Sequence, residues 1–213
     1  MKIEELHWQV RIQFNKLANN HNLSLTDVEI DNALNQGQED YINTYFYGSF
    51  EANRQKLDMV STIIKSLEQS SVDKDVVLTK PKDYRSFIRG SVTQGNCKTV
   101  IHVERESGIE KVLLDFHRKP SIKFARSIMM EEVDKLKIYN EKEGDKTILI
   151  FYLKEPAQMR LGSYKDINNN QLLVKTECEL PQQFQNLLVD FSVNYLKRIY
   201  GLQEDSRPIL SNK

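Results

Sequence analysis

The order of hydrophobic patterns along the chain restricts its fold more than any other feature. Helix-type periodicity fills the first third, short strand-type runs fill the middle, and one amphipathic helix follows at 181–200. Helical ends around a strand-rich middle predict a bundle that closes on itself and carries a β insert. A chain of 213 residues has room for this arrangement, because folding at this length buries on the order of 70% of the unfolded surface.

Three helices are expected in the first part of the chain. The first has an apolar stripe at spacings of three and four, formed by Ile3, Leu6, Val10, Phe14 and Leu17. The second is expected to begin after Ser24 or Thr26, since both side chains suit an N-cap. The third is expected to present Phe50, Leu57, Val60, Ile63, Ile64 and Leu67.

Strands are expected in the middle of the chain, where β-branched and aromatic residues lie between turn-forming ones. The expected strands lie at 84–92, 97–103, 109–116, 147–153, 158–164 and 172–178. Ser107–Gly108 predicts a tight hairpin before the run 109–116. The run 121–136 is ambiguous, and we favour a helix over part of it.

These patterns predict an α+β fold, in which three N-terminal helices and the C-terminal helix form a helical bundle with an inserted antiparallel β-rich module. The expected parts are bundle helices at 1–72, the module at 73–180, the last bundle helix at 181–200 and an extended tail at 201–213. Pro181 suits the first turn of the last helix, and Gly201 suits its end. The tail has two interpretations, a frayed terminus or an arm that orders on a neighbouring subunit.

The charge balance argues against a protein that coats nucleic acid. Lys plus Arg and Asp plus Glu each number 30, so the formal net charge is zero, whereas such proteins usually carry a basic excess. A local basic patch remains compatible with this balance.

The two cysteines and the hydropathy pattern favour a soluble protein that is not secreted. Cys97 and Cys178 are too few for a disulfide framework or a four-cysteine zinc site, so we expect free thiols in a reducing cytosol. The N-terminal residues lack the apolar stretch of a signal peptide. No run approaches the length of a membrane span, so no membrane partner is expected.

One pair of residues fits general-base chemistry, but its surroundings do not. Asp115 and His117 share a face if a strand continues through them, and the aspartate could then orient the imidazole. No nucleophile elbow, third metal-type ligand or glycine-rich loop accompanies the pair. A surface hydrogen bond is the favoured interpretation, and we expect no catalytic, cofactor-binding or metal-binding residues.

Two further groups are candidates for contacts with other molecules. A candidate DNA-contact patch consists of Arg118, Lys119, Lys123 and Arg126, interleaved with Phe116 and Phe124. The favoured alternative for this patch is a solvated charged edge. Candidate subunit-interface anchors are Tyr45, Phe46, Tyr47, Pro208, Ile209 and Leu210.

Two sequence blocks together resemble virion proteins of crAss-like bacteriophages. The first block is 31–42, Asp-Asn-Ala-Leu-Asn-Gln-Gly-Gln-Glu-Asp-Tyr-Ile, continued at 50–53 and 56–57. The second block combines 151–156, Phe-Tyr-Leu-Lys-Glu-Pro, with 178–181, Cys-Glu-Leu-Pro. The apolar residues of the last helix also match, whereas a histidine of the similar proteins is replaced near Gln185.

The resemblance implies a structural head-to-tail connector of a short-tailed phage. Such a protein would form a ring of about a dozen copies, dock on the portal protein, extend the DNA channel and attach other tail or ring proteins. It would contact passing genomic DNA without sequence specificity and would reside in the virion, after assembly in the host bacterial cytoplasm. No catalytic residue carries over. The alternatives are a tail-side ring, an assembly or completion factor, or a nucleic-acid-binding accessory protein.

Overall fold

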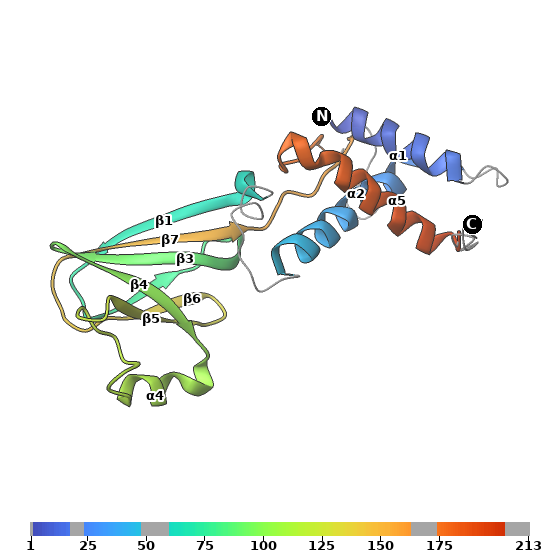
Figure 1. The fold of residues 1–213 in the computed structure, drawn as a ribbon. Coiled ribbons are helices and arrows are strands. Elements are labelled where there is room, and N and C mark those ends of the chain that lie inside the picture. The colour runs from blue at the N-terminus through green and yellow to red at the C-terminus, as the bar shows by residue number, and fades with distance from the viewer. Residues whose placement is uncertain (1, 18–23, 48–59, 163–173, 203–213) are drawn as a thin grey trace, which may run out of the picture. The chain divides into compact units, whose positions relative to one another are not determined.

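The protein divides into two compact units in a computed structural model that describes residues 2–17, 24–47, 60–162 and 174–202 (Figure 1). Residues 1–62 and 157–213 belong to one unit, here called the helical unit. Residues 63–156 belong to the other, here called the β unit. The chain therefore enters the β unit once, returns once, and completes the helical unit with its C-terminal part.

Three α-helices make up the described core of the helical unit. They are α1 (Ile3–Leu17), α2 (Asp27–Ile42) and α5 (Gln185–Ile199), with a π-helical turn at Asn43–Tyr47 and a 3₁₀ turn at Gln182–Phe184. The predicted stripe of α1 is confirmed, because its first four members are fully buried. Helix α5 packs against both α1 and α2.

Aromatic contacts and one glycine hold α5 in place. Phe14 lies against Tyr200 with ring centroids 5.4 Å apart, and Tyr41 meets Phe191 edge-on at 6.2 Å. A Cβ atom on Gly37 would lie 2.4 Å from Oγ of Ser192 and 2.9 Å from its backbone nitrogen. Only glycine therefore permits this close approach of α2 to α5.

The start of α2 and the end of α5 are capped at residues that the sequence indicates. Thr26 and Glu29 form a reciprocal capping box at the start of α2. Gly201 has φ +65° after α5, and the backbone N–H of Leu202 donates to the carbonyl of Lys197 at 3.0 Å. This is the hydrogen bond of a Schellman motif, which ends the helix.

The β unit contains one seven-stranded sheet in the described part of the chain, in the order β1-β7-β3-β4-β5-β6-β2. Its strands are β1 (Ile64–Ser71), β2 (Asp75–Thr79), β3 (Tyr84–Gln94), β4 (Cys97–Glu104), β5 (Arg126–Glu131), β6 (Lys135–Tyr139) and β7 (Lys146–Lys154). Neighbouring strands are antiparallel except β4 and β5, which are parallel. Helix α4 (Glu106–Leu114) supplies the crossover that a parallel pair requires.

The sheet curls strongly, because its two edge strands are consecutive in the chain. Only residues 72–74 separate β1 from β2, and so short a link spans roughly 14 Å at most. The concave side encloses a core of Val76, Leu78, Val92, Ile101, Met129, Leu136, Ile138, Ile148 and Ile150. On the other side, α4 packs through Ile109 and Val112 onto Ile128, Met130 and Tyr139.

The predicted bundle of three N-terminal helices plus the C-terminal helix is wrong. Residues 64–71 form β1, not the end of a third helix, and pair along their whole length with β7. The inserted sheet is also mixed and not purely antiparallel. Residues 50–59 of the expected third helix lie outside the described residues. Pairing with an apolar strand far along the chain outweighs the local helix-like spacing of Ile63, Ile64 and Leu67.

Two local predictions in the middle of the chain are also wrong. The run 109–116 and its Ser107–Gly108 hairpin are replaced by α4, which covers the outer face of β5 and β6. The run 121–136 contains β5 and the start of β6, with no α-helix. The expected strands at 84–92, 97–103 and 147–153 are confirmed. In the described part of 158–164 and 172–178 there is only an isolated bridge between Arg160 and Thr176.

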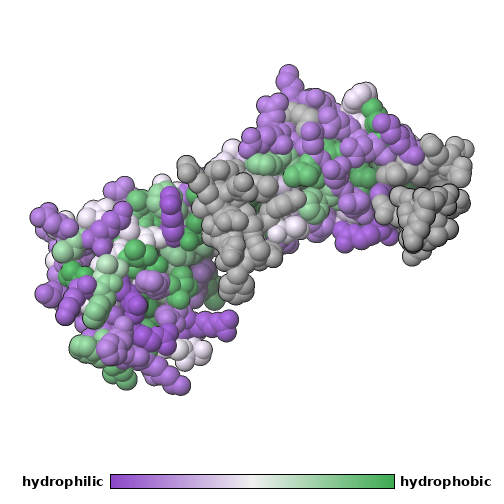
Figure 2. Space-filling view, viewed as in Figure 1, coloured by the Kyte–Doolittle hydropathy of each residue, from purple (hydrophilic) through white to green (hydrophobic). Residues whose placement is uncertain are grey.

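Several large apolar side chains remain exposed on each unit. Trp8 on α1 is 64% exposed, and Leu114, Phe116 and Phe124 are exposed between the last residue of α4 and the start of β5. On the face drawn in Figure 2, hydrophobic residues of the β unit reach the surface between hydrophilic ones. These positions are the natural places to look for contacts with other molecules.

Candidate functional site

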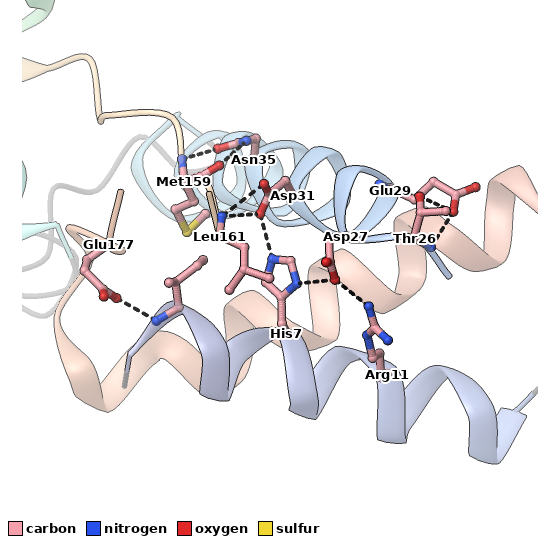
Figure 3. A network of polar contacts seen from close by, with 11 residues as sticks. His7, Arg11, Thr26, Asp27, Glu29, Asp31, Asn35, Met159, Leu161 and Glu177 are labelled. Atoms are coloured by element: carbon pink, nitrogen blue, oxygen red, sulfur yellow. Dashed lines mark hydrogen bonds and ion pairs between the residues drawn. The ribbon is translucent and has the colours of Figure 1, made fainter. Parts of the chain in front are cut away.

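A buried polar network of the helical unit joins α2 to residues 157–161, here called the crossing segment (Figure 3). Asn35 donates through Nδ2 to the carbonyl of Met159 at 3.0 Å and accepts from the backbone N–H of Met159 at 2.7 Å. Its amide therefore satisfies both backbone groups of a residue with no strand neighbour at this point. Gln38 adds a bond of 3.4 Å to the carbonyl of Ala157.

Asp31 is the centre of this network. Both of its carboxylate oxygens accept from the backbone N–H of Leu161, at 3.0 and 3.1 Å. One of them also lies 2.6 Å from Nε2 of His7. Asp31 and His7 are both buried, so the carboxylate is held by hydrogen bonds that take the place of water.

Charged residues extend the network toward the surface. Nδ1 of His7 lies 3.8 Å from Asp27, which accepts from Arg11 at 2.5 Å. Glu177 accepts from the backbone N–H of Ile3 at 2.6 Å and so satisfies one free donor at the start of α1.

Glu179 holds the two points at which the chain leaves and re-enters the helical unit. Its carboxylate accepts from the backbone N–H of Ala157 at 2.9 Å. Its carbonyl accepts from the hydroxyl of Thr62. Residues 62 and 157, which flank the β unit in the sequence, are therefore bonded to the same residue.

This network binds the backbone of the crossing segment. His7 and Asp31 have the contact of a general-base pair, but both are buried and Asp31 also binds the backbone. Two cavities of about 780 and 300 Å³ are lined by β-unit residues and include neither side chain. What the arrangement does chemically is satisfy the polar groups of an irregular segment.

Asp115 and His117 do not lie on a strand as their pairing required. They occupy a turn after α4, where Oδ1 of Asp115 accepts from the backbone N–H of His117 at 2.8 Å. The carboxylate therefore caps its own turn, and the bond that it makes is to the backbone and not to the imidazole.

The four cationic residues of the predicted DNA patch fall into two classes. Arg118 pairs with Glu104 at 2.8 Å, and Arg126 donates to the carbonyl of His117 at 2.8 Å. The ammonium groups of Lys119 and Lys123 lie over exposed phenylalanine rings instead. The arginines thus brace the fold, and the lysines face outward.

The predicted interface anchors are only partly described. Phe46 is half-buried in the π-helical turn that follows α2. The side chains of Tyr45 and Tyr47 lie outside the described part of the structure. So do Pro208, Ile209 and Leu210.

The two cysteines occupy different environments and are not bonded to each other. Cys97 is exposed at the start of β4, whereas burial raises the pKa of the Cys178 thiol to about 11. Among the described residues, no group of histidine, cysteine and acidic side chains is placed to hold a metal ion. The helices of this same part of the chain all lack the length and apolar character needed to cross a membrane.

The sequence analysis did not identify this network, although the pattern of polar residues in α2 indicates it. Asp31, Asn35 and Gln38 are spaced by four and three, so they share a helix face with Leu34 and Tyr41. Polar residues on the apolar face of a helix indicate buried hydrogen bonds. The partner, an irregular backbone far along the chain, has no sequence pattern of its own.

Comparisons with known proteins add no relative. Neither the protein-family models nor the curated proteins match this chain.

Proposed function

We propose that this chain is a structural, non-catalytic subunit of a short-tailed bacteriophage particle of the crAss-like kind. It forms a ring of its own copies at the head–tail junction, docks on the portal protein and extends the DNA channel. The ring then attaches tail components. The resemblance of the two sequence blocks is the source of this proposal, and their arrangement in the fold supports it.

The observation that carries the proposal is that the first block binds the segment that directly follows residues 151–156 of the second block. Residues 31–42 lie in α2, and the crossing segment follows directly after 151–156. The polar side chains of the first block hold the backbone that leaves the second one. The polar side chains of the first block are used in hydrogen bonds within the fold. Such a use fits a protein with a structural function.

Two features of this chain suit a ring subunit. The helical unit has capped helices and a buried polar network, which favour one fixed conformation. A head-to-tail contact between copies closes into a ring when its rotation divides a full turn. Zero net charge allows DNA to pass along the channel without strong retention.

Quantitative mass spectrometry of purified particles, scaled to the portal protein, tests the proposal. We expect about one copy of this chain for each portal subunit. Absence from the particle, with the chain present only in the lysate, would overturn the structural role and favour an assembly factor.

Fractionation separates the connector from a tail-side ring. We expect DNA-filled heads without tails to retain the chain, because a connector docks on the portal. Recovery with free tails and not with heads would contradict docking on the portal and assign the ring to the tail side.

A further inference from the structure

Positive charge is concentrated in one stretch of the β unit. Residues 115–126 contain four lysines and arginines and one aspartate, whereas the whole chain has no net charge. The stretch folds into two successive turns between α4 and β5. Each turn carries one exposed phenylalanine beside one lysine.

The first turn presents Phe116. The carbonyl of Asp115 accepts from the backbone N–H groups of Arg118 and Lys119 at 3.2 and 2.9 Å, which closes the turn. Phe116 is 66% exposed, and Nζ of Lys119 lies 5.2 Å from the centroid of its ring. One face of an aromatic ring and a cation are thus offered together.

The second turn presents Phe124. Ser121 and Arg126 exchange two backbone hydrogen bonds of 2.8 Å, and the backbone N–H of Ala125 donates to Ile122 at 3.0 Å. Lys123 and Phe124 occupy the tip, where Phe124 is 49% exposed and Nζ of Lys123 lies 5.7 Å from its ring centroid.

The backbone of the second turn is strained, and the two turns are joined. Ala125 has φ +50°, a region that residues other than glycine seldom adopt. Such strain persists where the surrounding structure enforces it, often at functional positions. Nη1 of Arg126 donates to the carbonyl of His117 at 2.8 Å and so ties the second turn to the first.

We propose that Phe116, Lys119, Lys123 and Phe124 form a contact surface for single-stranded nucleic acid. The rings stack on unpaired bases, and the two ammonium groups bind the phosphates between them. Exposed aromatic rings beside cations are the combination that grips single strands without sequence preference. Duplex DNA offers the phosphates but not the base faces, so it binds less well. This surface is independent of the proposed ring.

Fluorescence anisotropy of a labelled oligothymidylate, titrated with the full chain over a series of salt concentrations, tests the surface. We expect F116A/F124A to lose about tenfold or more in affinity. The salt dependence should stay unchanged in this variant, because its phosphate contacts remain. We expect K119Q/K123Q to lower the slope of log K against log salt by about 1.4, since each phosphate contact on a single strand contributes about 0.7.

Two matched controls keep the test specific. K82Q/K142Q removes the same charge from exposed positions in other turns of the β unit, and V133S removes an exposed apolar side chain from the β5–β6 turn. Both should bind like the unchanged chain, and circular dichroism should show that every variant is folded.

Three results would each overturn the proposal: no binding by the unchanged chain, equal losses in the controls, or equal affinity for duplex DNA. Absence of binding would point to an acidic protein segment as the partner of these turns.

Discussion

Asn35 takes the place of a neighbouring strand for Met159. A primary amide carries one acceptor and two donors, so it can pair with the N–H and the carbonyl of one residue at once. The bonds of 2.7 and 3.0 Å use both functions. Because Met159 is fully buried, water has no access to replace either bond if the amide is lost.

Replacing Asn35 with aspartate should therefore destabilise the helical unit. The change keeps the acceptor for the Met159 N–H but sets a second oxygen against the Met159 carbonyl. We expect the free energy of unfolding to fall by about 1–3 kcal/mol. Urea denaturation followed by the fluorescence of Trp8, the single tryptophan of the chain, reports on this unit. Asn194→Asp on the exposed face of α5 is the control, and equal losses in both variants would contradict the role of Asn35.

The two cysteines should react at very different rates. Burial raises the pKa of Cys178 from 9.0 to about 11, so at pH 8 its thiolate is roughly a hundredfold scarcer than for an ordinary thiol. Because the folded state holds this proton more tightly, the contribution of the thiol to stability is complete below pH 9.0. It is lost as the pH rises through about 11.

Iodoacetamide labelling followed by mass spectrometry measures this difference. We expect rapid modification of the exposed Cys97 and slow modification of Cys178 at pH 8. In urea the two should label at similar rates. Fast labelling of Cys178 in the folded chain would show that the thiol is not buried.

At the scale of elements, the sequence around Gly108 allows two interpretations, a hairpin turn or the helix α4. If Ser107–Gly108 formed a hairpin turn, the glycine would be required. In α4 it has helical geometry, and a Cβ atom added to it meets nothing within 4 Å. Glycine is the least favourable residue at such a position apart from proline.

Gly108→Ala should stabilise the β unit by about 0.5–1 kcal/mol, because alanine lowers the conformational entropy of the unfolded chain. Gly95→Ala is the matched contrast. Gly95 also has open space around its Cβ position but has φ +55°, so alanine there is strained and should destabilise. Thermal unfolding followed by far-UV circular dichroism measures both. A loss of stability in Gly108→Ala would contradict the helix.

The sequence predicts well those helices, caps and strands that depend on residues close together in the chain. The stripe of α1, the N-cap at Thr26 (one of two candidates) and the end of α5 at Gly201 each depend on residues a few positions apart. The runs that became β3, β4 and β7 are bounded by turn residues and carry strong β propensity.

The wrong prediction for residues 64–71 has a physical cause in pairing over long sequence distance. The burial of β1 does not alternate between faces, so its period gives no strand signal, and only its register with β7 makes it a strand. The run 109–113 has apolar residues at 109, 112 and 113, which is the spacing of a helix. It becomes helical because the outer face of β5 and β6 needs an apolar cover.

The candidate site follows the same division. The cationic residues at 118–126 are visible in the sequence, but their roles are not, because the partners Glu104 and the His117 carbonyl come from the fold. The network around Asp31 depends on a segment that is 130 residues away in the sequence.

At the scale of the whole molecule, the β unit is inserted between two closely placed points. Thr62 and Ala157 are both bonded to Glu179 in the helical unit. In the β unit, Ile64 pairs with Leu153, so the two ends of the insert lie on neighbouring strands, which are about 5 Å apart. Within each unit, the two chain segments that lead to the other unit are therefore held close together.

This arrangement predicts that each unit folds without the other. We expect a chain in which a Gly/Ser linker of about four residues replaces 63–156 to keep its helices and the fluorescence of Trp8, since such a linker easily spans neighbouring points. Residues 63–156 alone should unfold cooperatively, because the core of the β unit comes entirely from within it. Circular dichroism and thermal unfolding of both chains measure this.

The control is the full chain with the same linker inserted at Gly95–Asn96, the tip of the β3–β4 hairpin. If the control folds and either excised unit does not, the two units depend on each other for stability, and the chain is one cooperative domain.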